Sequence, residues 1–334
     1  MIKICVCGGG SLGHVCAGVL ASQDDVKVNI FTQNPERWSH HIKARDLNGK
    51  VYEGNLEIIS NNPEETVNSC DIIFLCLPGF AIGKTLESIN PFIGNAVVGS
   101  IVCSTGFFFA AHRILGDKVK LFGFQRVPFI ARTNEYGHSA NILGYKPQIA
   151  VAIENIQDTE NFRLLVEKLW MTPTKLLSSH FEASLTNSNP ILHTGRLYSM
   201  WKDWNGEVYD HLILFYKEWT VEASQLLIDM DAEFMKLLDV LPVNKGAIPS
   251  LLEYYESKDA ISLCEKISHI PAFQEIKSPM KEVAGGWIPD FDSRYFTEDF
   301  PYGLYFIKHL AEEKGIGTPV IDKVFTWGMS KCNK

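Results

Sequence analysis

A glycine-rich segment near the start of the chain places the strongest constraint on the fold. The apolar run at residues 2–7 leads directly into Gly8-Gly9-Gly10-Ser11-Leu12-Gly13, and residues 12–22 have helical composition. A strand, a G-x-G-x-x-G turn and a helix in this order are typical of a dinucleotide-binding unit, in which the helix N-terminus faces a pyrophosphate. The alternative is a glycine-rich turn with no ligand.

Each residue of this loop has an expected task. Gly8 permits the tight turn, Gly10 lets the backbone approach the pyrophosphate, and Gly13 lets the helix pack on the strand. We therefore predict that the cofactor-binding residues include Gly8, Gly10, Ser11, Leu12 and Gly13.

The first half of the chain continues to alternate strand and helix signals. Strand-like runs lie at residues 26–31, 71–77, 96–103, 119–124 and 148–153. Strands separated by helical stretches indicate βαβ units and a parallel sheet covered on both faces. After about residue 180 no convincing strand follows, and helices are expected at 211–241, 248–256, 260–268 and 300–330. The prediction is an α/β Rossmann-type dinucleotide-binding domain over residues 1–178, followed by an all-α domain over residues 179–334.

Charge and composition exclude several classes of protein. The 334 residues carry 31 Lys and Arg against 39 Asp and Glu, a net charge of −8, which argues against nucleic-acid binding. No apolar run reaches the roughly 18–20 residues that a membrane span needs. The chain opens on a strand-like run instead of a signal peptide. The eight cysteines form no C-x-x-C pair, so we expect reduced thiols, no metal site and a cytoplasmic protein.

The choice between NAD and NADP stays open. The second strand ends at Phe31-Thr32-Gln33-Asn34-Pro35-Glu36-Arg37, with no carboxylate at the tip itself. Gln33 can hydrogen-bond either form of the ribose, and Arg37 can meet a 2′-phosphate. The alternative is that Asn34-Pro35 is only a turn.

Two further strand ends are expected to lie beside the cofactor. The run 71–77 ends at Pro78, and the next strand ends at Ser104-Thr105-Gly106. Ligands of such sheets bind outside the carboxyl ends of the strands, so Pro78 and Gly106 are predicted cofactor neighbours. Plain transitions from strand to loop explain both segments equally well.

Two segments of the second half carry polar groups suited to acid–base chemistry. One runs from Asn187 to Gly195 and contains the single histidine His193. The other, residues 290–301, is dense in charged and aromatic residues and contains Arg294 and Asp299. The alternatives are a structural histidine, a helix N-cap for Asp299, and a surface cation paired with Asp292 or Glu298 for Arg294.

Several motifs together resemble one family. They are Cys5-Val-Cys-Gly-Gly-Gly10 followed by His14, Glu36-Arg37-Trp38, Arg113-Ile-Leu-Gly-Asp-Lys118, the segment from His193 to Trp201-Lys-Asp-Trp-Asn-Gly206 and, most specifically, Asp290-Phe-Asp-Ser-Arg-Tyr-Phe-Thr-Glu-Asp299. The last matches the Asp-Phe-x-x-Arg-Tyr-x-Thr-Glu-Asp signature of the opine dehydrogenases, the octopine/nopaline group. The resemblance runs from about residue 1 to residue 331 in one register.

The resemblance implies an activity and roles for particular residues. The family condenses an α-keto acid, often pyruvate, with the amino group of an amino acid and reduces the imine with NAD(P)H. By position, His193 corresponds to the catalytic histidine and Asp299 to the carboxylate paired with it. Arg294 corresponds to an arginine linked to cofactor binding and domain closure, and Asn189 is expected to bind substrate. The implied partners are a keto acid and an amino acid, and a homodimer is allowed.

One departure from the family concerns the amino donor. Where the family has Phe-Glu-Thr-Leu-Pro-Trp, this chain has Phe124-Gln125-Arg126-Val127-Pro128-Phe129. The family glutamate is associated with a cationic amino substrate, and Arg126 would repel one. A neutral or acidic donor is therefore expected, unless Arg126 points to solvent. Two other hypotheses about the function of the chain remain open: a 2-hydroxyacid or glycerol-3-phosphate type of dehydrogenase, and a non-catalytic nucleotide-binding sensor.

Overall fold

The computed structural model describes residues 1–104 and 106–332, so Thr105 of the predicted strand end lies outside the described residues. The chain divides into two compact units, Met1–Ser184 and Leu185–Lys334. This boundary falls slightly after the predicted one at residues 178 and 179. The difference arises in helix α6 (His180–Leu185), because its first residue donates a hydrogen bond to Glu154 of the first unit.

The first unit is built on one mixed sheet, which has eleven strands in the described part of the chain. The order across the sheet is β11-β10-β7-β6-β5-β1-β2-β4-β3-β9-β8. The strand bounds are β1 Ile2–Cys7, β2 Val26–Phe31, β3 His41–Asp46, β4 Val51–Ser60, β5 Ile72–Leu75, β6 Val97–Ser100, β7 Leu121–Phe124, β8 Phe129–Glu135, β9 Ser139–Tyr145, β10 Ile149–Glu154 and β11 Thr174–Leu176.

Strand β1 occupies the centre of the parallel part of this sheet. Its last residue, Cys7, pairs with Phe31 of β2 on one side and with Leu75 of β5 on the other. All neighbours from β4 through β2, β1, β5 and β6 to β7 run parallel. The strand order reverses direction between β1 and β5, which is where doubly wound sheets bind their ligands.

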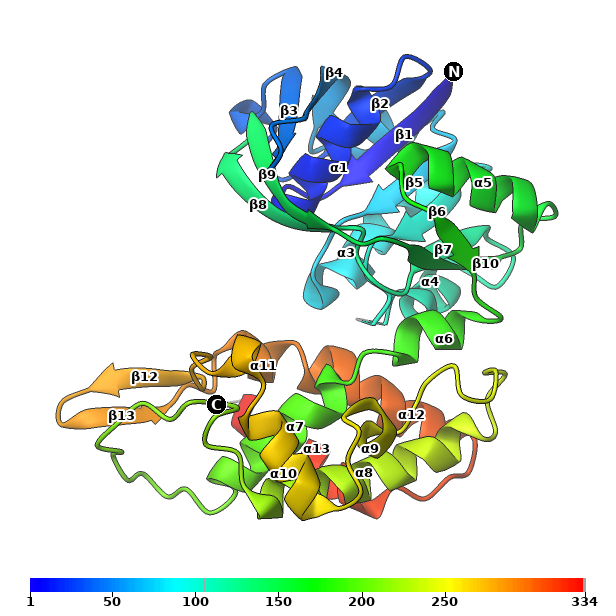
Figure 1. Ribbon diagram of the computed structural model, residues 1–334. Coiled ribbons are helices and arrows are strands. Elements are labelled where there is room, and N and C mark those ends of the chain that lie inside the picture. The colour runs from blue at the N-terminus through cyan, green and yellow to red at the C-terminus, as the bar shows by residue number, and fades with distance from the viewer. Residues whose placement is uncertain (105, 333–334) are drawn as a thin grey trace. The chain divides into compact units, whose positions relative to one another are not determined.

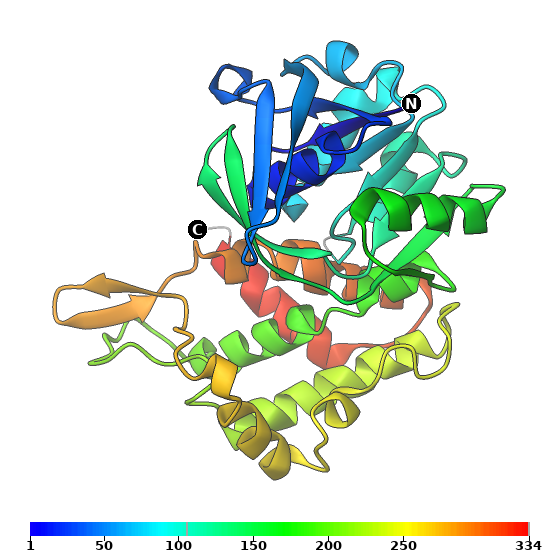
Figure 2. The ribbon, with the colours of Figure 1, turned by 45° about the horizontal axis from the view of Figure 1, so that its top comes forward.

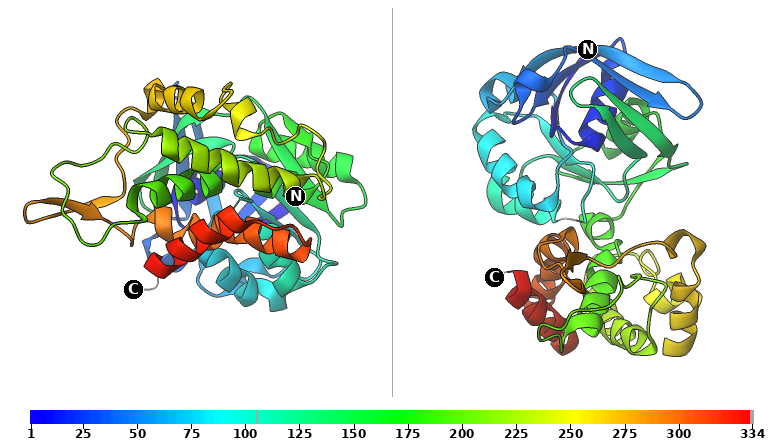
Figure 3. Two further views of the ribbon diagram at one scale, coloured as in Figure 1. Left: turned by 90° about the horizontal axis from the view of Figure 1, so that it is seen from below. Right: turned by 90° about the vertical axis from the view of Figure 1, so that its left-hand side faces the viewer.

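Helices cover both faces of the sheet, as the sequence predicted (Figure 3, right). Ile4 and Val6 of β1 belong to the core that also contains Leu20 and Trp170, whereas Cys5 and Cys7 belong to the core on the other face. This alternation follows from the two-residue period of a strand. The covering helices are α1 Ser11–Ala21 and α5 Thr159–Trp170 on the first face, and α2 Pro63–Val67, α3 Gly79–Ile89 and α4 Phe107–Leu115 on the second.

Five strands, β3, β4, β8, β9 and β11, were not predicted from the sequence. Strands β3 and β4 form an antiparallel pair, as do β8 and β9, so the sheet is mixed and not purely parallel. Strand β3 shows why they were missed: Ile42 and Ala44 are buried, while Lys43 and Arg45 between them are exposed. Such a short alternating strand at one side of a sheet lacks the continuous apolar run of the central strands.

The second unit is mainly helical, and α7 packs against both α8 and α13 (Figure 3, left). Glu233 of α8 accepts hydrogen bonds from the backbone N–H groups of Val320 and Ile321, both at 3.0 Å, and so fixes the start of α13. The helices are α7 Asn189–Trp201, α8 Val221–Leu238, α9 Leu251–Tyr254, α10 Ala260–Ser268, α11 Arg294–Thr297, the π-turn η4 Phe300–Leu304, α12 Tyr305–Glu313 and α13 Pro319–Cys332. Short 3₁₀ turns lie at η1 Pro35–Arg37, η2 Asn90–Phe92 and η3 Pro271–Phe273.

The predicted helix at 211–241 is wrong in its first third. Helix α8 begins only after Thr220, whose hydroxyl caps it by accepting a hydrogen bond from the N–H of Ala223. The preceding segment forms turns and isolated bridges instead, such as Leu214 with Lys277. The helix expected at 248–256 is shorter, whereas the helix at 260–268 is confirmed.

A two-stranded hairpin in the second unit was also not predicted. It consists of β12 (Met280–Val283) and β13 (Gly286–Pro289), drawn in orange in Figures 1 and 2. Ala284 and Gly285 form its turn, and φ is positive at Gly285 (+90°) and at Gly286 (+148°), the first residue of β13. It extends away from the helices of its unit and pairs with Tyr209 through a bridge at Trp287.

The described residues contain neither a membrane-spanning helix nor a cluster of metal-ligating side chains. None of the helices at 1–104 or 106–332 is long and apolar enough to cross a bilayer. In the same residues, no group of three or more His, Cys, Asp or Glu side chains is arranged to hold a metal ion.

Candidate functional site

The glycine loop joins the end of β1 to the start of α1. Gly8 has φ of +124°, and a Cβ there would lie 2.6 Å from the carbonyl oxygen of Cys76. A Cβ at Gly10 would have no atom within 4 Å, so this position faces open space. Gly10 is the N-cap of α1, and the helix has no side-chain cap. The first N–H groups of α1 are thus available to an anion that approaches Gly10.

Gly13 has a structural task on the inner side of the loop. A Cβ at this position would lie 2.1 Å from the carbonyl oxygen of Gly8, closer than any real contact. The first turn of α1 therefore packs directly on the backbone of the loop, as the motif requires.

His14 holds the loop from behind. Its Nδ1 lies 2.9 Å from the carbonyl oxygen of Gly10, and its Nε2 accepts a hydrogen bond from the N–H of Gly137 at 2.6 Å. Because the N–H of Gly137 is a donor only, Nδ1 carries the proton and donates to Gly10. Burial lowers the pKa of His14, so the ring is neutral and structural. Ser11 strengthens the same connection by accepting a hydrogen bond from the N–H of Thr133 at 3.0 Å.

The segment after β2 begins with the buried Thr32 and carries no carboxylate at the strand tip. Gln33 and Arg37 are both exposed. The guanidinium of Arg37 lies over the ring of Tyr136, 4.2 Å from its centroid. Arg37 is therefore held by cation–π contact at the rim of the unit that carries the glycine loop.

Pro78, Gly106, Gln125 and Arg126 all follow strands of the parallel sheet. Pro78 is the N-cap of α3 after β5, and Gly106, with φ of +80°, is the N-cap of α4 after β6. Gln125 follows β7 and donates from Nε2 to the carbonyl oxygen of Glu182 at 3.4 Å. Arg126, next to it, is exposed. The carboxyl ends of β1, β5, β6 and β7 share one edge of the sheet, so these residues lie along the edge that carries the glycine loop.

His193 and Asp299 meet in the second unit. Nδ1 of His193 on α7 lies 2.8 Å from Oδ2 of Asp299, and the two side chains are 12% and 21% exposed. Asp299 is the N-cap residue of η4, yet its side chain caps no backbone group. Its carboxylate is directed to His193 instead, which disfavours the purely structural alternative. Asn189 lies one helical turn before His193 on α7 and is half-buried.

Tyr216 contacts the other nitrogen of the same imidazole and was not predicted as a site residue. Its hydroxyl lies 3.1 Å from Nε2 of His193. Burial is the main cause that raises the pKa of Tyr216 above its usual value, so the phenol stays protonated at neutral pH. Tyr295 also packs on His193, with ring centroids 4.8 Å apart, and burial raises its pKa too.

Arg196 fixes the segment that carries Tyr216. It lies one turn after His193 on α7 and is only 3% exposed. Its Nε donates to the carbonyl oxygen of Phe215 at 3.1 Å, and its Nη2 donates to that of Glu218 at 2.6 Å. Burial lowers the pKa of Arg196 to about 10. Burying a guanidinium is costly unless it is hydrogen-bonded, and the two bonds to backbone carbonyls that satisfy it here also hold residues 215–218 in place.

The remaining predicted residue, Arg294, opens α11 and is exposed. Tyr295 could have been predicted as a site residue, because it lies in the segment from Asp290 to Asp299 that matches the family signature. Arg196 lies within the segment from His193 to Gly206, but no pattern there assigned it a role. Tyr216 was missed because the apolar spacing of residues 211–241 suggested a continuous helix with Phe215 and Trp219 on its buried stripe.

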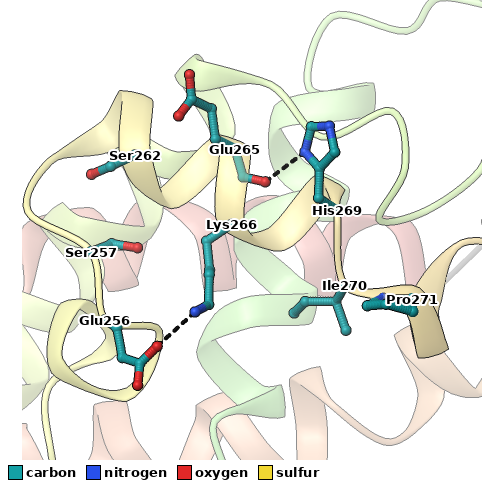
Figure 4. A pocket seen from close by; sticks show the side chains of 8 residues that line it. All are labelled: Glu256, Ser257, Ser262, Glu265, Lys266, His269, Ile270 and Pro271. Atoms are coloured by element: carbon teal, nitrogen blue, oxygen red, sulfur yellow. Dashed lines mark hydrogen bonds and ion pairs between the residues drawn. The ribbon is translucent and has the colours of Figure 1, made fainter.

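A surface pocket of about 580 Å³ lies elsewhere in the second unit (Figure 4). An ion pair between Lys266 and Glu256, 2.7 Å long, crosses it, and His269 contacts the carbonyl oxygen of Glu265. None of the predicted site residues lines this pocket, whose lining consists of Glu256, Ser257, Ser262, Glu265, Lys266, His269, Ile270 and Pro271.

Comparison with protein families gives two matches. Residues 176–332 match the α-helical domain of NAD/NADP octopine/nopaline dehydrogenases, and residues 4–104 match the ketopantoate reductase PanE/ApbA family. The first match contains His193, Tyr216 and Asp299, and the second contains the glycine loop.

Individual relatives match over the whole chain. Octopine dehydrogenase of Mizuhopecten yessoensis is 29% identical over 100% of this chain and 90% of its own length. Tauropine dehydrogenase of Arabella iricolor is 28% identical over 100% of this chain and 92% of its own length. The solved structure of octopine dehydrogenase with NADH and L-arginine is 26% identical, with a TM-score of 0.87 over 99% of this chain and 89% of that one.

Proposed function

The chain belongs to the opine dehydrogenase family, and we propose that it joins an α-keto acid to the amino group of an amino acid in an NAD(P)H-dependent reductive condensation. The observation that carries this proposal is the 2.8 Å hydrogen bond between His193 and Asp299. These two residues come from distant parts of the second unit, at the positions that the family signature assigns to its catalytic pair.

His193 is suited to general acid–base work. Asp299 accepts the Nδ1–H hydrogen bond and thereby selects one tautomer, which leaves Nε2 as the nitrogen that exchanges protons. In the direction of synthesis, His193 gives up the proton on Nε2, and the hydroxyl oxygen of the carbinolamine gains one proton. The C–O bond then breaks, water leaves with the electron pair, and a C=N bond forms. In the opposite direction His193 takes the proton back.

The residues of the glycine loop fit a dinucleotide. Gly8 permits the tight turn of the loop, and the open space at Gly10, which adjoins the uncapped start of α1, permits close approach of the backbone to the pyrophosphate. We assign the pyrophosphate to the backbone at Gly8, Gly10, Ser11, Leu12 and Gly13, with Pro78 and Gly106 beside the cofactor. When bound, the nicotinamide supplies the hydride that reduces the C=N carbon. Arg294 is assigned, by family position, to cofactor binding and closure.

The β2 tip is compatible with both NAD and NADP. It offers Gln33 to the ribose and Arg37 to a 2′-phosphate, and no carboxylate at the tip repels that phosphate. Titration with NADH and NADPH, in the wild type and in Arg37→Ala, decides between them. If the variant binds NADPH more weakly and NADH as before, Arg37 binds the 2′-phosphate. An equal loss of affinity for both cofactors would contradict that assignment.

The amino donor is expected to be neutral or acidic. A cationic donor near Arg126 would meet like-charge repulsion of roughly 1–4 kcal/mol at about 4 Å. We expect kcat/KM to be higher with alanine or glutamate than with arginine or lysine, and Arg126→Thr to narrow that difference. Gln125 and Asn189 are assigned to substrate binding or closure. Arginine as the preferred donor of the wild type would contradict this choice of donor and leave the reaction class intact.

The test of the function itself is direct. Oxidation of NADH and NADPH is followed with pyruvate and a panel of amino acids, and the secondary amine product is identified by mass spectrometry. Cofactor binding without turnover on any pair of substrates would favour a non-catalytic sensor, and turnover of a keto acid without an amino acid would favour a 2-hydroxyacid dehydrogenase.

Two further features belong to this proposal. The eight cysteines are all free, which supports work in a reducing compartment such as the cytoplasm. A homodimer is the oligomeric state we propose to test first, by sedimentation at several protein concentrations.

A further inference from the structure

Both ring nitrogens of His193 already have partners in the structure. A neutral imidazole has one in-plane hydrogen-bond direction at each nitrogen. Asp299 takes the direction at Nδ1, at 2.8 Å, and the Tyr216 hydroxyl takes the one at Nε2, at 3.1 Å. A proton that leaves or enters Nε2 in this geometry therefore passes to or from the oxygen of Tyr216.

The position of Tyr216 is fixed by its surroundings. The residue is 6% exposed, and its ring stacks on Phe273 with centroids 4.4 Å apart and on Trp219 with centroids 6.0 Å apart. Arg196 holds the carbonyl groups on both sides of it, at Phe215 and Glu218. Displacing the hydroxyl from Nε2 would require unstacking two aromatic rings from a segment that is bonded to a buried guanidinium.

A phenol is chemically suited to pass a proton on. Its oxygen can accept from one group while its O–H donates to another. The ionised form of Tyr216 is disfavoured, since the phenol is buried close to the negative charge of Asp299. The hydroxyl therefore has no tendency to keep a charge, and it returns to its neutral state after each transfer.

We propose that Tyr216 is a catalytic residue that relays the proton between Nε2 of His193 and the reacting oxygen of the substrate. This inference rests on the proposed function. In the direction of synthesis, the Nε2–H bond breaks as its proton binds the Tyr216 oxygen. The original phenolic proton moves to the carbinolamine hydroxyl, which leaves as water. Tyr216 ends unchanged, and His193 has lost one proton.

The decisive variant is Tyr216→Phe, because it removes the hydroxyl and keeps the stacked ring. We expect kcat to fall about 100-fold or more, which is the usual cost of losing a general acid–base group. The affinity for NADH, measured by fluorescence titration, should stay the same. The double variant with His193→Ala should be no slower than His193→Ala alone, because residues that act as a unit are not additive.

Tyr255→Phe is the matched control. Tyr255 is a second buried phenol of the same unit, 8% exposed, whose pKa burial raises to about 12. Its removal should leave kcat within about twofold of the wild type. The solvent isotope effect adds a second measurement: a relay moves two protons in one step, so a curved proton inventory is expected for the wild type.

The outcomes separate the two proposals. A Tyr216→Phe enzyme within about threefold of the wild-type kcat would show that the substrate displaces the phenol and receives its proton directly from Nε2, and the relay would be wrong. A wild type without turnover on any pair of substrates would overturn the proposed function, and the relay with it. Loss of thermal stability in Tyr216→Phe together with a kcat close to that of the wild type would mean that the hydroxyl is only structural, which also contradicts the relay.

Discussion

The glycine loop and the His193 cluster are built in opposite ways. The loop presents backbone groups within six consecutive residues, Gly8 to Gly13, and its shape follows from what a Cβ would obstruct. The cluster presents side chains from three separate places in the chain, His193, Tyr216 and Asp299. A backbone site is encoded locally, whereas a side-chain site exists only once α7, η4 and the segment before α8 have packed together.

The largest expected effect is a loss of turnover that leaves cofactor binding unchanged, which would show that the two sites act independently. His193→Ala or Asp299→Ala should lower kcat/KM about 10²–10⁴-fold, because the general acid–base group or its partner is lost. NADH should bind as before, since neither residue belongs to the unit that carries the glycine loop. Steady-state kinetics and fluorescence titration of the purified variants measure the two quantities. Near wild-type rates in His193→Ala would remove His193 from the mechanism.

Gly13→Ala should disrupt the glycine loop by disturbing the packing of α1 against it. The added Cβ would lie 2.1 Å from the carbonyl oxygen of Gly8, so α1 or the loop must shift. Overpacking of this kind typically costs about 1–3 kcal/mol or more, and cofactor binding should be lost with the local structure. Thermal unfolding with and without NADH tests this. An unchanged melting temperature would mean that the loop is more adaptable than its packing indicates.

The helical unit contains a carboxylate whose titration opposes folding. Burial raises the pKa of Asp231 from 3.8 to about 6, although the N–H of Leu251 donates to it at 2.8 Å. Between about pH 4 and pH 6 the unfolded chain has released this proton while the folded chain retains it. The free energy of unfolding should therefore fall as the pH rises through this window, by an amount on the order of 3 kcal/mol at most.

Asp231→Asn keeps an acceptor for Leu251 and removes the titration. The variant should lose the fall between about pH 4 and pH 6 and should be the more stable protein at pH 7. Urea unfolding at several pH values measures this, with Asp229→Asn, an exposed position on the same helix, as the control. The same pH dependence in Asp231→Asn and in the wild type would show that another group is responsible.

Gly10→Ala should have the smallest effect, and only the affinity for the cofactor should change. Gly10 has φ of −83°, which alanine adopts without strain, and its Cβ would meet no protein atom within 4 Å. Stability should be unchanged, while NADH affinity should fall about tenfold, since the Cβ would occupy the approach of the pyrophosphate. Unchanged affinity would show that the phosphates do not approach this glycine.

The contrast between local and distant encoding also explains what the sequence could predict. The glycine loop, its flanking strand and helix, and α10 follow from patterns within about ten residues. The hairpin of β12 and β13 has only Gly285-Gly286 as a local signal. Residues 211–220 have the apolar spacing of a helix, although α8 begins only after its cap at Thr220. His193 and Asp299 were reached by resemblance to a family signature. Tyr216 lies in a segment whose apolar spacing was misleading, so its contact with His193 could be found only from the folded chain.

His14 gives the cofactor loop a property that its own sequence does not show. The imidazole ties the carbonyl of Gly10 to the N–H of Gly137, and Ser11 adds a tie to Thr133. The loop is thereby ordered before any ligand arrives, so the conformational entropy of that ordering is lost during folding and not during binding. By thermodynamic linkage, a ligand of the loop stabilises the turn between β8 and β9, although more than a hundred residues separate the two along the chain.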